Sequence, residues 1–571
     1  MSHFVSQYPP QDGSACGVVG LPAGAWIPML VMAWVLFGLV GHDPWKADEA
    51  YTFGIVVDLL RHGDWVVPTL AGESFVEKPP LFYIVSAAAA YLFGGLLPLH
   101  DAARLATGLF VGTALLFLGL TAREIYGRGH AAACVMIFIS CLGTFVRLHQ
   151  LITDVALLAG MAIGTFGLAL ARRRHWSAGL ALGTGMACAF FAKGLLGPGL
   201  LALTSLLLLS FAPWRTWRYR SILSVAALIA IIPAAIWMYA LHARSPELFR
   251  EWLVVNNFGR FLGFTRIGPH APPGYYGYTL LWYAFPALPL AGYAVWTAWR
   301  RSEADSVRRN MQLPAVLAIV VASVLGFAND SRELYLLPLM LPLSLLAAVG
   351  IVWLPAAGAN AMSGSARWGF GAAAILIWLG WVVLVTGFPS QLQSLLLDYQ
   401  PGFVPRIHWI HLALAVCATL VAGTFMSRRR RTSSGHALTQ WALGLTLCWA
   451  LLATLWMPYF DAGKSYRAMI GSLAAQLPRN GCVASLNLGE PQRGLMVYFA
   501  KVTTVRLEVA PDARCDALLV QGRRSIGAPP PEAESDWIAV WEGARPGDLK
   551  EFYRLYRRDV APDRALVQFP E

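Results

Sequence analysis

Long runs of apolar residues alternate with short polar connections along most of the chain. Many of these runs hold roughly 17 to 25 residues, the length of helix that crosses a hydrocarbon core of about 30 Å. Examples begin at Ala25, Leu201, Ala366 and Trp441. The pattern predicts a polytopic α-helical membrane protein. The run from Ala25 to Gly41 is interpreted as a retained first span, because no Lys or Arg precedes it and no small-residue cleavage site follows it.

Arginine clusters between the apolar runs predict the topology, since loops rich in Lys and Arg stay cytoplasmic. The clusters are Arg123 with Arg128, Arg172–Arg174, Arg215 with Arg218 and Arg220, Arg300 and Arg301 with Arg308 and Arg309, and Arg428–Arg431. If the run from Leu81 to Leu97 crossed the membrane, all of these clusters would face outward. We therefore predict that Leu81–Leu97 lies along the membrane interface.

The remaining runs make about thirteen predicted spans. They are residues 24–42, 101–122, 130–149, 152–171, 177–193, 196–212, 221–241, 277–299, 312–328, 334–354, 367–388, 406–426 and 437–457. An odd number of spans places a cytoplasmic N-terminus and an outer C-terminal tail on opposite sides. The transmembrane domain is thus predicted at 1–458, with large outer loops at 41–100 and 242–276.

The tail at 459–571 has a different composition, with charges, a Pro529–Pro531 run and alternating segments such as Cys482–Leu488. It is interpreted as a small soluble α/β domain outside the cytoplasm. Cys482 and Cys515 would then lie in an oxidising compartment, where a disulfide and two free buried thiols are both compatible with the sequence.

Composition agrees with a membrane protein and argues against nucleic-acid binding. Of the 571 residues 57% are hydrophobic and 13% charged, and the mean hydropathy is +0.54, too apolar for a soluble core. The formal charge of +12 comes from clusters between spans, which topology and anionic lipid explain without a nucleic-acid partner. No zinc-type Cys spacing and no internal repeat of a transporter is evident.

The other ionisable residues gather on the predicted outer rim, which indicates one shared aqueous cavity because such groups are costly in lipid. They occur at Asp48–Glu49, Asp58, Arg61, Asp64 and Glu77–Lys78 in the first loop, at Asp154 and Lys193, in the loop with Asn256, Asn257, Arg260, Arg266 and His270, and at Asp330, Arg332, Glu333 and Tyr335. Asp48 and Asp154, with the adjacent Glu49, are candidate catalytic carboxylates that could activate an acceptor hydroxyl. Lys78, Lys193, Arg260 and Arg332 could bind a phosphate leaving group. The combination predicts group transfer from a phospholipid-like donor.

Simpler interpretations exist for several of these residues. Asp48 alone would be taken as a solvated loop carboxylate, and Lys193 could extend from a helix end toward the membrane surface. His270 is interpreted as a solvated loop residue. Trp65, Tyr275, Tyr276 and Tyr278 are interpreted as interfacial aromatics rather than sugar-binding platforms.

Several motifs resemble the C-type glycosyltransferases. The stretch with Asp48-Glu49-Ala50-Tyr51, Gly63-Asp64-Trp65 and Glu77-Lys78-Pro79-Pro80 is similar to their first outer loop, above all in bacterial aminoarabinose transferases and the protein-mannosyltransferase-like group. Thr153-Asp154, Ala192-Lys193-Gly194, Asn257-Phe258-Gly259-Arg260 and Ser331–Pro338 follow in the expected order. The motifs cover Asp48 to about Pro342.

The resemblance implies thirteen helices, interfacial helices in the first periplasmic loop and a periplasmic C-terminal domain in the bacterial inner membrane. It implies acidic catalytic positions at Asp48 and Asp154, carrier-phosphate binding by Lys78, and a cavity lined by Lys193, Arg260 and Tyr335. It also implies that Glu77 can touch a divalent metal.

Two departures concern the sugar, the acceptor and the metal. Tyr51 occupies a position where aminoarabinose transferases usually have Arg, and Asn256-Asn257 replaces their Glu-His, which removes a candidate metal ligand. The sequence therefore identifies no cofactor with certainty, and a divalent metal stays one option.

The main hypothesis is a monomeric transferase that moves a sugar, with 4-amino-4-deoxy-L-arabinose as one candidate, from undecaprenyl phosphate to lipid A or another envelope acceptor. A transferase acting on protein or another glycan is the second hypothesis. A non-enzymatic transporter of lipid-linked sugar is the third.

Overall fold

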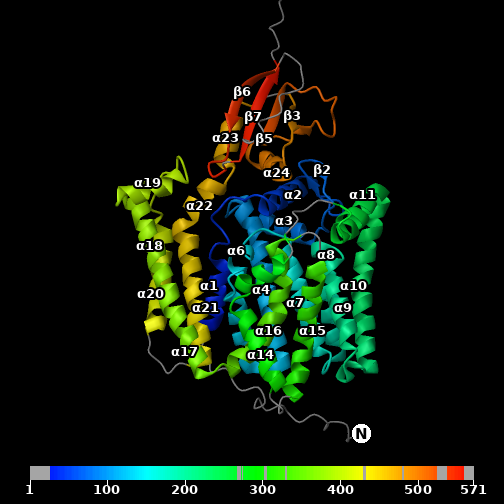
Figure 1. Cartoon of the computed structure of the whole chain (residues 1–571). Helices are drawn as coiled ribbons and strands as arrows, with labels where there is room; N and C mark the ends of the chain where they lie inside the picture. Colours follow the sequence, from blue (N-terminus) through cyan, green and yellow to red (C-terminus); the bar gives the residue numbers. More distant parts are fainter. Residues whose placement is uncertain are drawn as a thin grey trace, which may run out of the picture.

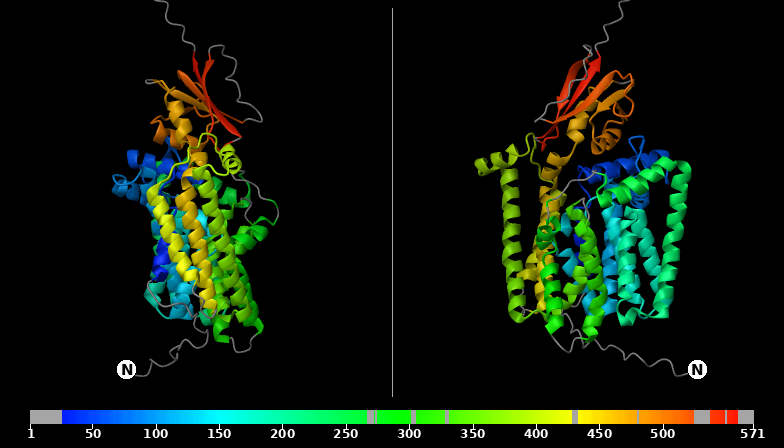
Figure 2. Two further views of the ribbon diagram at one scale, coloured as in Figure 1. Left: turned by 90° about the vertical axis from the view of Figure 1, so that its left-hand side faces the viewer. Right: turned by 45° about the vertical axis from the view of Figure 1, so that its right-hand side comes forward.

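The computed structural model describes residues 26–265, 272, 274–300, 305–327, 331–427, 433–478, 481–523, 537–548 and 550–558. A bundle of helices forms the larger part, and a mixed sheet with two short helices lies beyond one end of it (Figure 1). Both further views in Figure 2 place the sheet at this same end. All nine predicted site residues lie within the described part. Arg266, His270 and Asp330, which were predicted to lie on the outer rim, fall outside it.

Seven helices within the described ranges are long and apolar enough to cross a membrane, by length and composition. They are Leu99–Tyr126, Trp217–Arg244, Val307–Phe327, Glu333–Trp353, Ala356–Thr386, Trp409–Met426 and Ser434–Lys464. Shorter apolar helices occupy Trp26–Leu36, Leu81–Phe93, Arg128–Ile139, Asp154–Leu170 and Leu196–Leu208. The fold is therefore polytopic and helical, as predicted, and the count of thirteen spans stays a prediction.

The helices of the bundle correspond to the apolar runs of the sequence. They are α1 (Trp26–Leu36), α4 (Leu99–Tyr126), α5 (Arg128–Ile139), α7 (Asp154–Leu170), α8 (His175–Lys193), α9 (Leu196–Leu208), α10 (Trp217–Arg244), α13 (Tyr275–Tyr283), α14 (Ala287–Arg300), α15 (Asp305–Phe327), α16 (Leu337–Trp353), α17 (Ala356–Ser365), α18 (Gly371–Thr386), α20 (Trp409–Ser427) and α21 (Ser434–Leu451). Helices α7 and α16 are almost fully buried and form the centre of the core.

Short helices lie at the end of the bundle that faces the sheet (Figure 1). Helix α2 (Asp48–His62) carries both acidic residues of its first turn at its N-terminus, where the helix dipole favours negative charge. A small hairpin of β1 (Thr69–Leu70) and β2 (Glu73–Ser74) leads to α3 (Leu81–Phe93). Helix α3 is 13 residues long, or about 20 Å, less than a bilayer core. Its interfacial position stays a prediction.

The C-terminal region combines strands and helices. Its sheet has the order β4-β3-β5-β7-β6, with β3 parallel to both β4 and β5 and with β5, β7 and β6 antiparallel. The elements are α23 (Arg467–Ala474), β3 (Val483–Leu486), α24 (Glu490–Phe499), β4 (Val505–Arg506), β5 (Ala517–Arg523), β6 (Trp537–Gly543) and β7 (Glu551–Arg558). Helix α21 continues through η5 (Leu452–Trp456) into α22 (Met457–Lys464), so helix and sheet region are joined after Lys464.

A disulfide joins Cys482 and Cys515. The sequence was compatible both with this disulfide and with two free thiols. The register explains the pairing, because Val483 of β3 lies opposite Ala517 of the parallel neighbour β5. The two cysteines precede these strands and so meet at the same edge, with Cα atoms 4.9 Å apart. The bond closes a stretch with a sequence separation of 33.

Candidate active site

A cavity of about 310 Å³ opens at the sheet-facing end of the bundle. Its charged and phenolic lining consists of Asp48, Glu77, Lys78, Asp154, Lys193, Arg260, Arg332 and Tyr335, and its other walls are mainly apolar. These eight residues come from six separate stretches of the chain. The fold thus brings every predicted site residue except Glu49 to one cavity.

The α7–α8 pair places Asp154 and Lys193. Asp154 is the first residue of α7 and Lys193 the last of α8, and the helices are joined by a short turn at residues 171–174. Their backbones approach so closely that a Cβ on Gly185 would lie 2.2 Å from the amide nitrogen of Gly164, as small residues allow in membrane helix pairs. The ends of the two helices therefore meet, and Lys193 forms an ion pair with Asp154.

Asn257 holds the turn that follows Lys193. Its side-chain oxygen accepts a 3.1 Å hydrogen bond from the Leu195 amide, and its side-chain nitrogen donates to the Trp252 carbonyl. Gly194 between Lys193 and Leu195 has φ +71°, and a Cβ there would lie 2.4 Å from the Asn257 oxygen. Glycine is required on both grounds. Asn257 therefore positions the lysine turn in this chain.

Asp48 is held by residues from two other segments. Arg332 donates to its carboxylate at 3.2 Å, and the Tyr51 hydroxyl donates to the same oxygen at 3.1 Å. Lys78 in turn donates to the Tyr51 hydroxyl at 2.7 Å. Tyr51 thus links a cation of the cavity to a carboxylate, and the family resemblance had not implied this role.

Glu77 lies among cations. Arg260 forms an ion pair with it and also donates to the Tyr335 hydroxyl at 3.4 Å, while the Lys78 ammonium lies 4.0 Å away. Burial alone would raise the pKa of Glu77, but the charges of Lys78 and Arg260 lower it to about 2. Lys193 lies 4.2 Å from the centre of the Tyr335 ring, a cation–π contact.

This surrounding does not suit a divalent metal. Lys78 and Arg260 would repel a cation at Glu77, and Asn257 faces the Lys193 turn. The described ranges contain no group of three or more His, Cys, Asp or Glu side chains that could hold a metal ion.

Glu49 lies on the other side of α2 and is 2% exposed. Arg104 of α4 donates to it at 3.1 Å, and the amides of Leu151 and Trp45 donate at 2.9 and 3.3 Å. Burial would raise the pKa of Glu49, but Arg104 and these partners hold it below its usual range. Glu49 therefore ties α2 to α4 and does not line the cavity.

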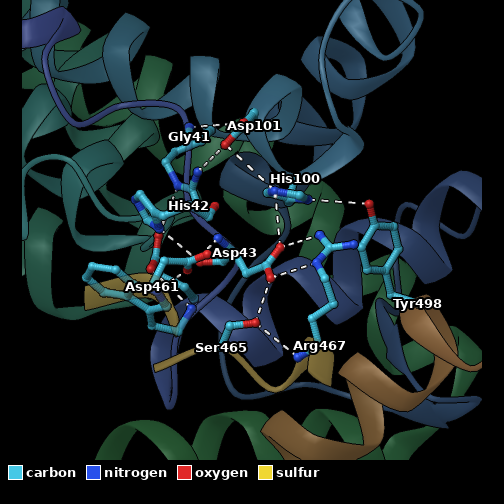
Figure 3. Close-up of polar contacts among 12 residues, drawn as sticks. Gly41, His42, Asp43, His100, Asp101, Asp461, Ser465, Arg467 and Tyr498 are labelled. Carbon is cyan, nitrogen blue, oxygen red and sulfur yellow. Dashed lines mark hydrogen bonds and ion pairs between the residues drawn. The ribbon is translucent and has the colours of Figure 1, made fainter. Parts of the chain in front are cut away.

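A buried polar network joins the loop before Asp48 to the sheet region (Figure 3). Asp43 accepts from Ser465 at 2.6 Å and from Arg467 Nε at 2.9 Å, and it lies 3.6 Å from His100. The carboxylate of Asp461 accepts from the Asp43 amide at 2.9 Å. These contacts set the position of the N-terminus of α2.

These supporting residues were not among the predicted site residues, although the sequence carries a signal for some of them. Asp101, Arg104 and Arg147 lie within predicted spans, where an ionisable side chain by itself indicates a functional or structural site. Asp43, Asp461 and Arg467 are far apart in the sequence, and no motif connected them.

No family model matches the chain. It is 29% identical over 343 residues to the undecaprenyl phosphate-α-4-amino-4-deoxy-L-arabinose arabinosyl transferase 1 of Sodalis glossinidius, covering 57% of this chain and 59% of that protein. It is also 29% identical over 457 residues to the undecaprenyl phosphate-α-4-amino-4-deoxy-L-arabinose arabinosyl transferase of Pseudomonas aeruginosa, covering 75% of this chain and 74% of that protein. The chain thus spans about three fifths of the first of these relatives.

Solved structures agree with these relatives. The crystal structure of ArnT from Cupriavidus metallidurans bound to undecaprenyl phosphate superposes with a TM-score of 0.66 at 15% identity, covering 94% of this chain and 98% of that one. The chain has the C-type glycosyltransferase fold. The apo form of the same ArnT gives a TM-score of 0.63 at 16% identity, covering 93% and 97%. The apolar helices and the aminoarabinose transferase relatives together indicate a protein of the bacterial inner membrane.

Proposed function

We propose that this protein transfers a sugar from undecaprenyl phosphate to a cell-envelope acceptor on the periplasmic side. Lipid A is the preferred acceptor and 4-amino-4-deoxy-L-arabinose the preferred sugar, on the strength of the relatives. The observation that carries the proposal is the single cavity in which four cations and three carboxylates meet beside an apolar wall. Its cations suit a phosphate and its apolar side suits the start of a polyprenyl chain.

In this proposal the carrier phosphate binds Lys78, Arg260 and Lys193. When no substrate is bound, each of these cations contacts a carboxylate or a phenol. The oxygens of the bound phosphate replace part of these contacts. As the bond between the anomeric carbon and the phosphate oxygen breaks, negative charge grows on the phosphate. Fixed cations stabilise that charge more in the transition state than in the bound donor.

Asp48 acts on the acceptor. It lies at the N-terminus of α2 and is oriented by Arg332 and Tyr51. A hydroxyl acceptor gives its proton to Asp48 while its oxygen bonds to the anomeric carbon, and the carrier phosphate leaves with the electron pair. A phosphate acceptor needs no proton removal, so Asp48 then orients it. Asp154 serves mainly to orient Lys193.

The proposed membrane orientation has the N-terminus in the cytoplasm and residues 459–571 in the periplasm, as the Arg-rich connections indicate. The turn at 171–174 is at the far end of α7 and α8 from Asp154 and Lys193, so it supports this orientation. The disulfide of Cys482 and Cys515 suits the oxidising periplasm. We propose a monomer that needs no metal.

The test measures transfer of labelled sugar from undecaprenyl phosphate to lipid A by the purified protein. Asp48→Asn and Lys78→Ala are expected to lower kcat/KM at least about a hundredfold. Asp398→Asn, which changes an exposed carboxylate of α19 (Ser390–Asp398), is the matched control and should retain full activity. Full transfer by Asp48→Asn or Lys78→Ala would refute the proposed site.

The acceptor hypotheses are separated by mass spectrometry of lipid A and of envelope proteins and glycans from cells with and without the gene. A mass shift on protein or glycan alone would favour the mannosyltransferase-like alternative. A transporter would move lipid-linked sugar across vesicles without forming a glycosidic bond.

A further inference from the structure

The loop between α1 and α2 contains no helix or strand, and it ends directly at Asp48. It comprises residues 37–47, all of which belong to the described part of the chain. Ala47 at the N-cap of α2 makes no side-chain cap hydrogen bond, so no local cap anchors the first turn of the helix. The position of the Asp48 backbone therefore depends on the groups that hold this loop.

The helix bundle holds the first part of the loop through α4. Asp101 accepts a 3.0 Å hydrogen bond from the Gly41 amide. The guanidinium of Arg104 donates to the carbonyls of Leu39 and His42 at 3.4 and 3.2 Å. These bonds fix the backbone of the loop where it leaves the bundle.

The second part of the loop is held from the C-terminal side (Figure 3). The Asp43 carboxylate accepts hydrogen bonds from the Ser465 hydroxyl at 2.6 Å and from Arg467 Nε at 2.9 Å. The carboxylate of Asp461 accepts from the Asp43 amide and from the Trp45 indole, both at 2.9 Å. The end of α22 and the start of α23 thus determine where residues 43–45 lie.

Arg467 is the charged partner of a buried carboxylate. Asp43 is 5% exposed. Burial would raise the pKa of Asp43, but hydrogen bonds from Arg467 and Ser465 hold it below its usual range. The Arg467 guanidinium lies 4.7 Å from the centre of the Phe499 ring of α24, so the sheet region also positions the cation. Because a buried carboxylate depends strongly on its charged partner, a change at Arg467 acts on the loop through Asp43.

The sheet region also lies directly on the helix that begins at Asp48. A Cβ on Gly54 of α2 would lie 2.8 Å from the Cα atom of Gly494 in α24, so the two backbones are in contact at this glycine pair. Beside Asp48, Lys46 donates to both carboxylate oxygens of Glu551 in β7 at 2.6 and 2.7 Å. The sheet region therefore contacts both α2 and the loop before it.

The cations proposed to bind the carrier phosphate come from other elements. Lys78 precedes α3, Lys193 ends α8 and Arg260 begins α12 (Arg260–Leu262). Among the described residues of the sheet region, none lines the cavity of the candidate active site. The path from Arg467 through Asp43 to Asp48 therefore does not pass through these cations.

We propose that Arg467 is a positioning residue of the transfer reaction, which acts through Asp43 on the loop that places the Asp48 carboxylate. The proposal rests on the proposed transferase function. Arg332 and Tyr51 orient the side chain of Asp48, whereas Arg467 sets its backbone. The sheet region then takes part in the reaction by placing a carboxylate that it does not touch.

The test measures three quantities for the full chain in detergent: kcat for transfer of labelled sugar, equilibrium binding of undecaprenyl phosphate, and Tm. Arg467→Gln is the principal variant, because an amide can still donate one hydrogen bond to Asp43 but carries no charge. Arg467→Lys restores the charge, and Asp43→Asn is made alone and together with Arg467→Gln. Arg554→Gln, which breaks an ion pair with Glu542 inside the sheet, is the matched control.

We expect Arg467→Gln to lower kcat about tenfold, the value of one hydrogen bond to a charged group. Binding of undecaprenyl phosphate should stay as in the wild type, and Arg467→Lys should recover most of kcat. Asp43→Asn should lower kcat to a similar extent. The double variant should be no slower than the slower single variant, because both substitutions remove the same contact. Arg554→Gln should match the wild type in all three measurements.

Three results would overturn the inference: wild-type kcat in Arg467→Gln, additive losses of kcat in the double variant, or losses of donor binding and Tm in step with kcat. The last result would indicate a general folding defect. Failure of the transferase function is visible separately, because the wild type itself would then neither bind undecaprenyl phosphate nor transfer sugar, which would overturn both proposals.

Discussion

Lys78 donates a 2.7 Å hydrogen bond to the hydroxyl of Tyr51. That hydroxyl donates in turn to Asp48, so a proposed phosphate-binding cation and a proposed catalytic carboxylate are joined through one phenol. The proposed donor binding at Lys78 and the proposed acceptor activation at Asp48 are therefore linked through the Tyr51 hydroxyl.

Substitution of Tyr51 tests this coupling. Tyr51→Phe leaves Asp48 with Arg332 as its remaining orienting partner, and kcat should fall about tenfold because one hydrogen bond to a charged group is lost. The KM for the undecaprenyl-phosphate-linked sugar should fall or stay constant, because Lys78 no longer has to break its hydrogen bond to Tyr51 in order to bind phosphate. Steady-state kinetics with labelled donor measure both parameters. A rise in carrier KM with unchanged kcat would contradict the coupling.

Glu77 distinguishes cation-based binding of the carrier phosphate from binding through a metal. Glu77→Gln should tighten undecaprenyl phosphate binding by roughly threefold to tenfold, because the phosphate no longer competes with a carboxylate for Arg260. Binding should be unchanged by EDTA in wild type and variant. Weaker binding in the variant, together with loss on chelation, would instead indicate a metal at Glu77.

Glu49 should affect stability more than chemistry. Its partner Arg104 is 0% exposed, and removing one member of a buried pair costs about 3 to 5 kcal/mol. Glu49→Gln should therefore lower the Tm in detergent, while Asp48→Asn should leave Tm nearly unchanged and abolish transfer. Differential scanning fluorimetry and the transfer assay are compared on the same preparations. If Glu49→Gln keeps its wild-type Tm and loses transfer, a catalytic role is restored.

His42 predicts a loss of stability in mild acid. Burial and the neighbouring charge of Arg104 lower its pKa from 6.5 to about 4. As the pH falls, His42 therefore binds a proton in the unfolded chain before it does so in the folded protein. The stability that the neutral, buried His42 contributes is complete above pH 6.5 and is lost as the pH falls toward about 4. Between about pH 6.5 and pH 5 the loss is roughly 1.5 kcal/mol.

The measurement is the Tm as a function of pH for wild type, His42→Gln and His62→Gln, an exposed histidine of α2. His42→Gln should flatten the decline, and His62→Gln should not. Glu77, with its lowered pKa of about 2, contributes stability that is lost only below its ordinary pKa of 4.5, so it does not affect this range. An identical slope in all three proteins would remove His42 as the cause.

Much of the cavity proposed to bind the donor could be predicted from sequence. Asp48, Lys78, Asp154, Lys193, Arg260, Arg332 and Tyr335 were candidates, and all of them line one cavity. Ionisable residues at the ends of apolar runs are costly unless they share water and partners, so their common location followed from their positions. Glu49 was grouped with Asp48 because they are adjacent, but successive helix residues point in different directions, and Glu49 faces Arg104.

The sequence by itself determined the class of the molecule, because no soluble core can bury its apolar runs, and it determined which polar residues could serve a site at one end. Only the tertiary structure decided the partners. The links from Lys78 through Tyr51 to Asp48, from Asn257 to the Lys193 turn, and from Arg147 to Glu333 connect segments up to 186 residues apart. Helix periodicity sets the face of each residue locally, whereas the neighbour of that face is set by how the helices pack.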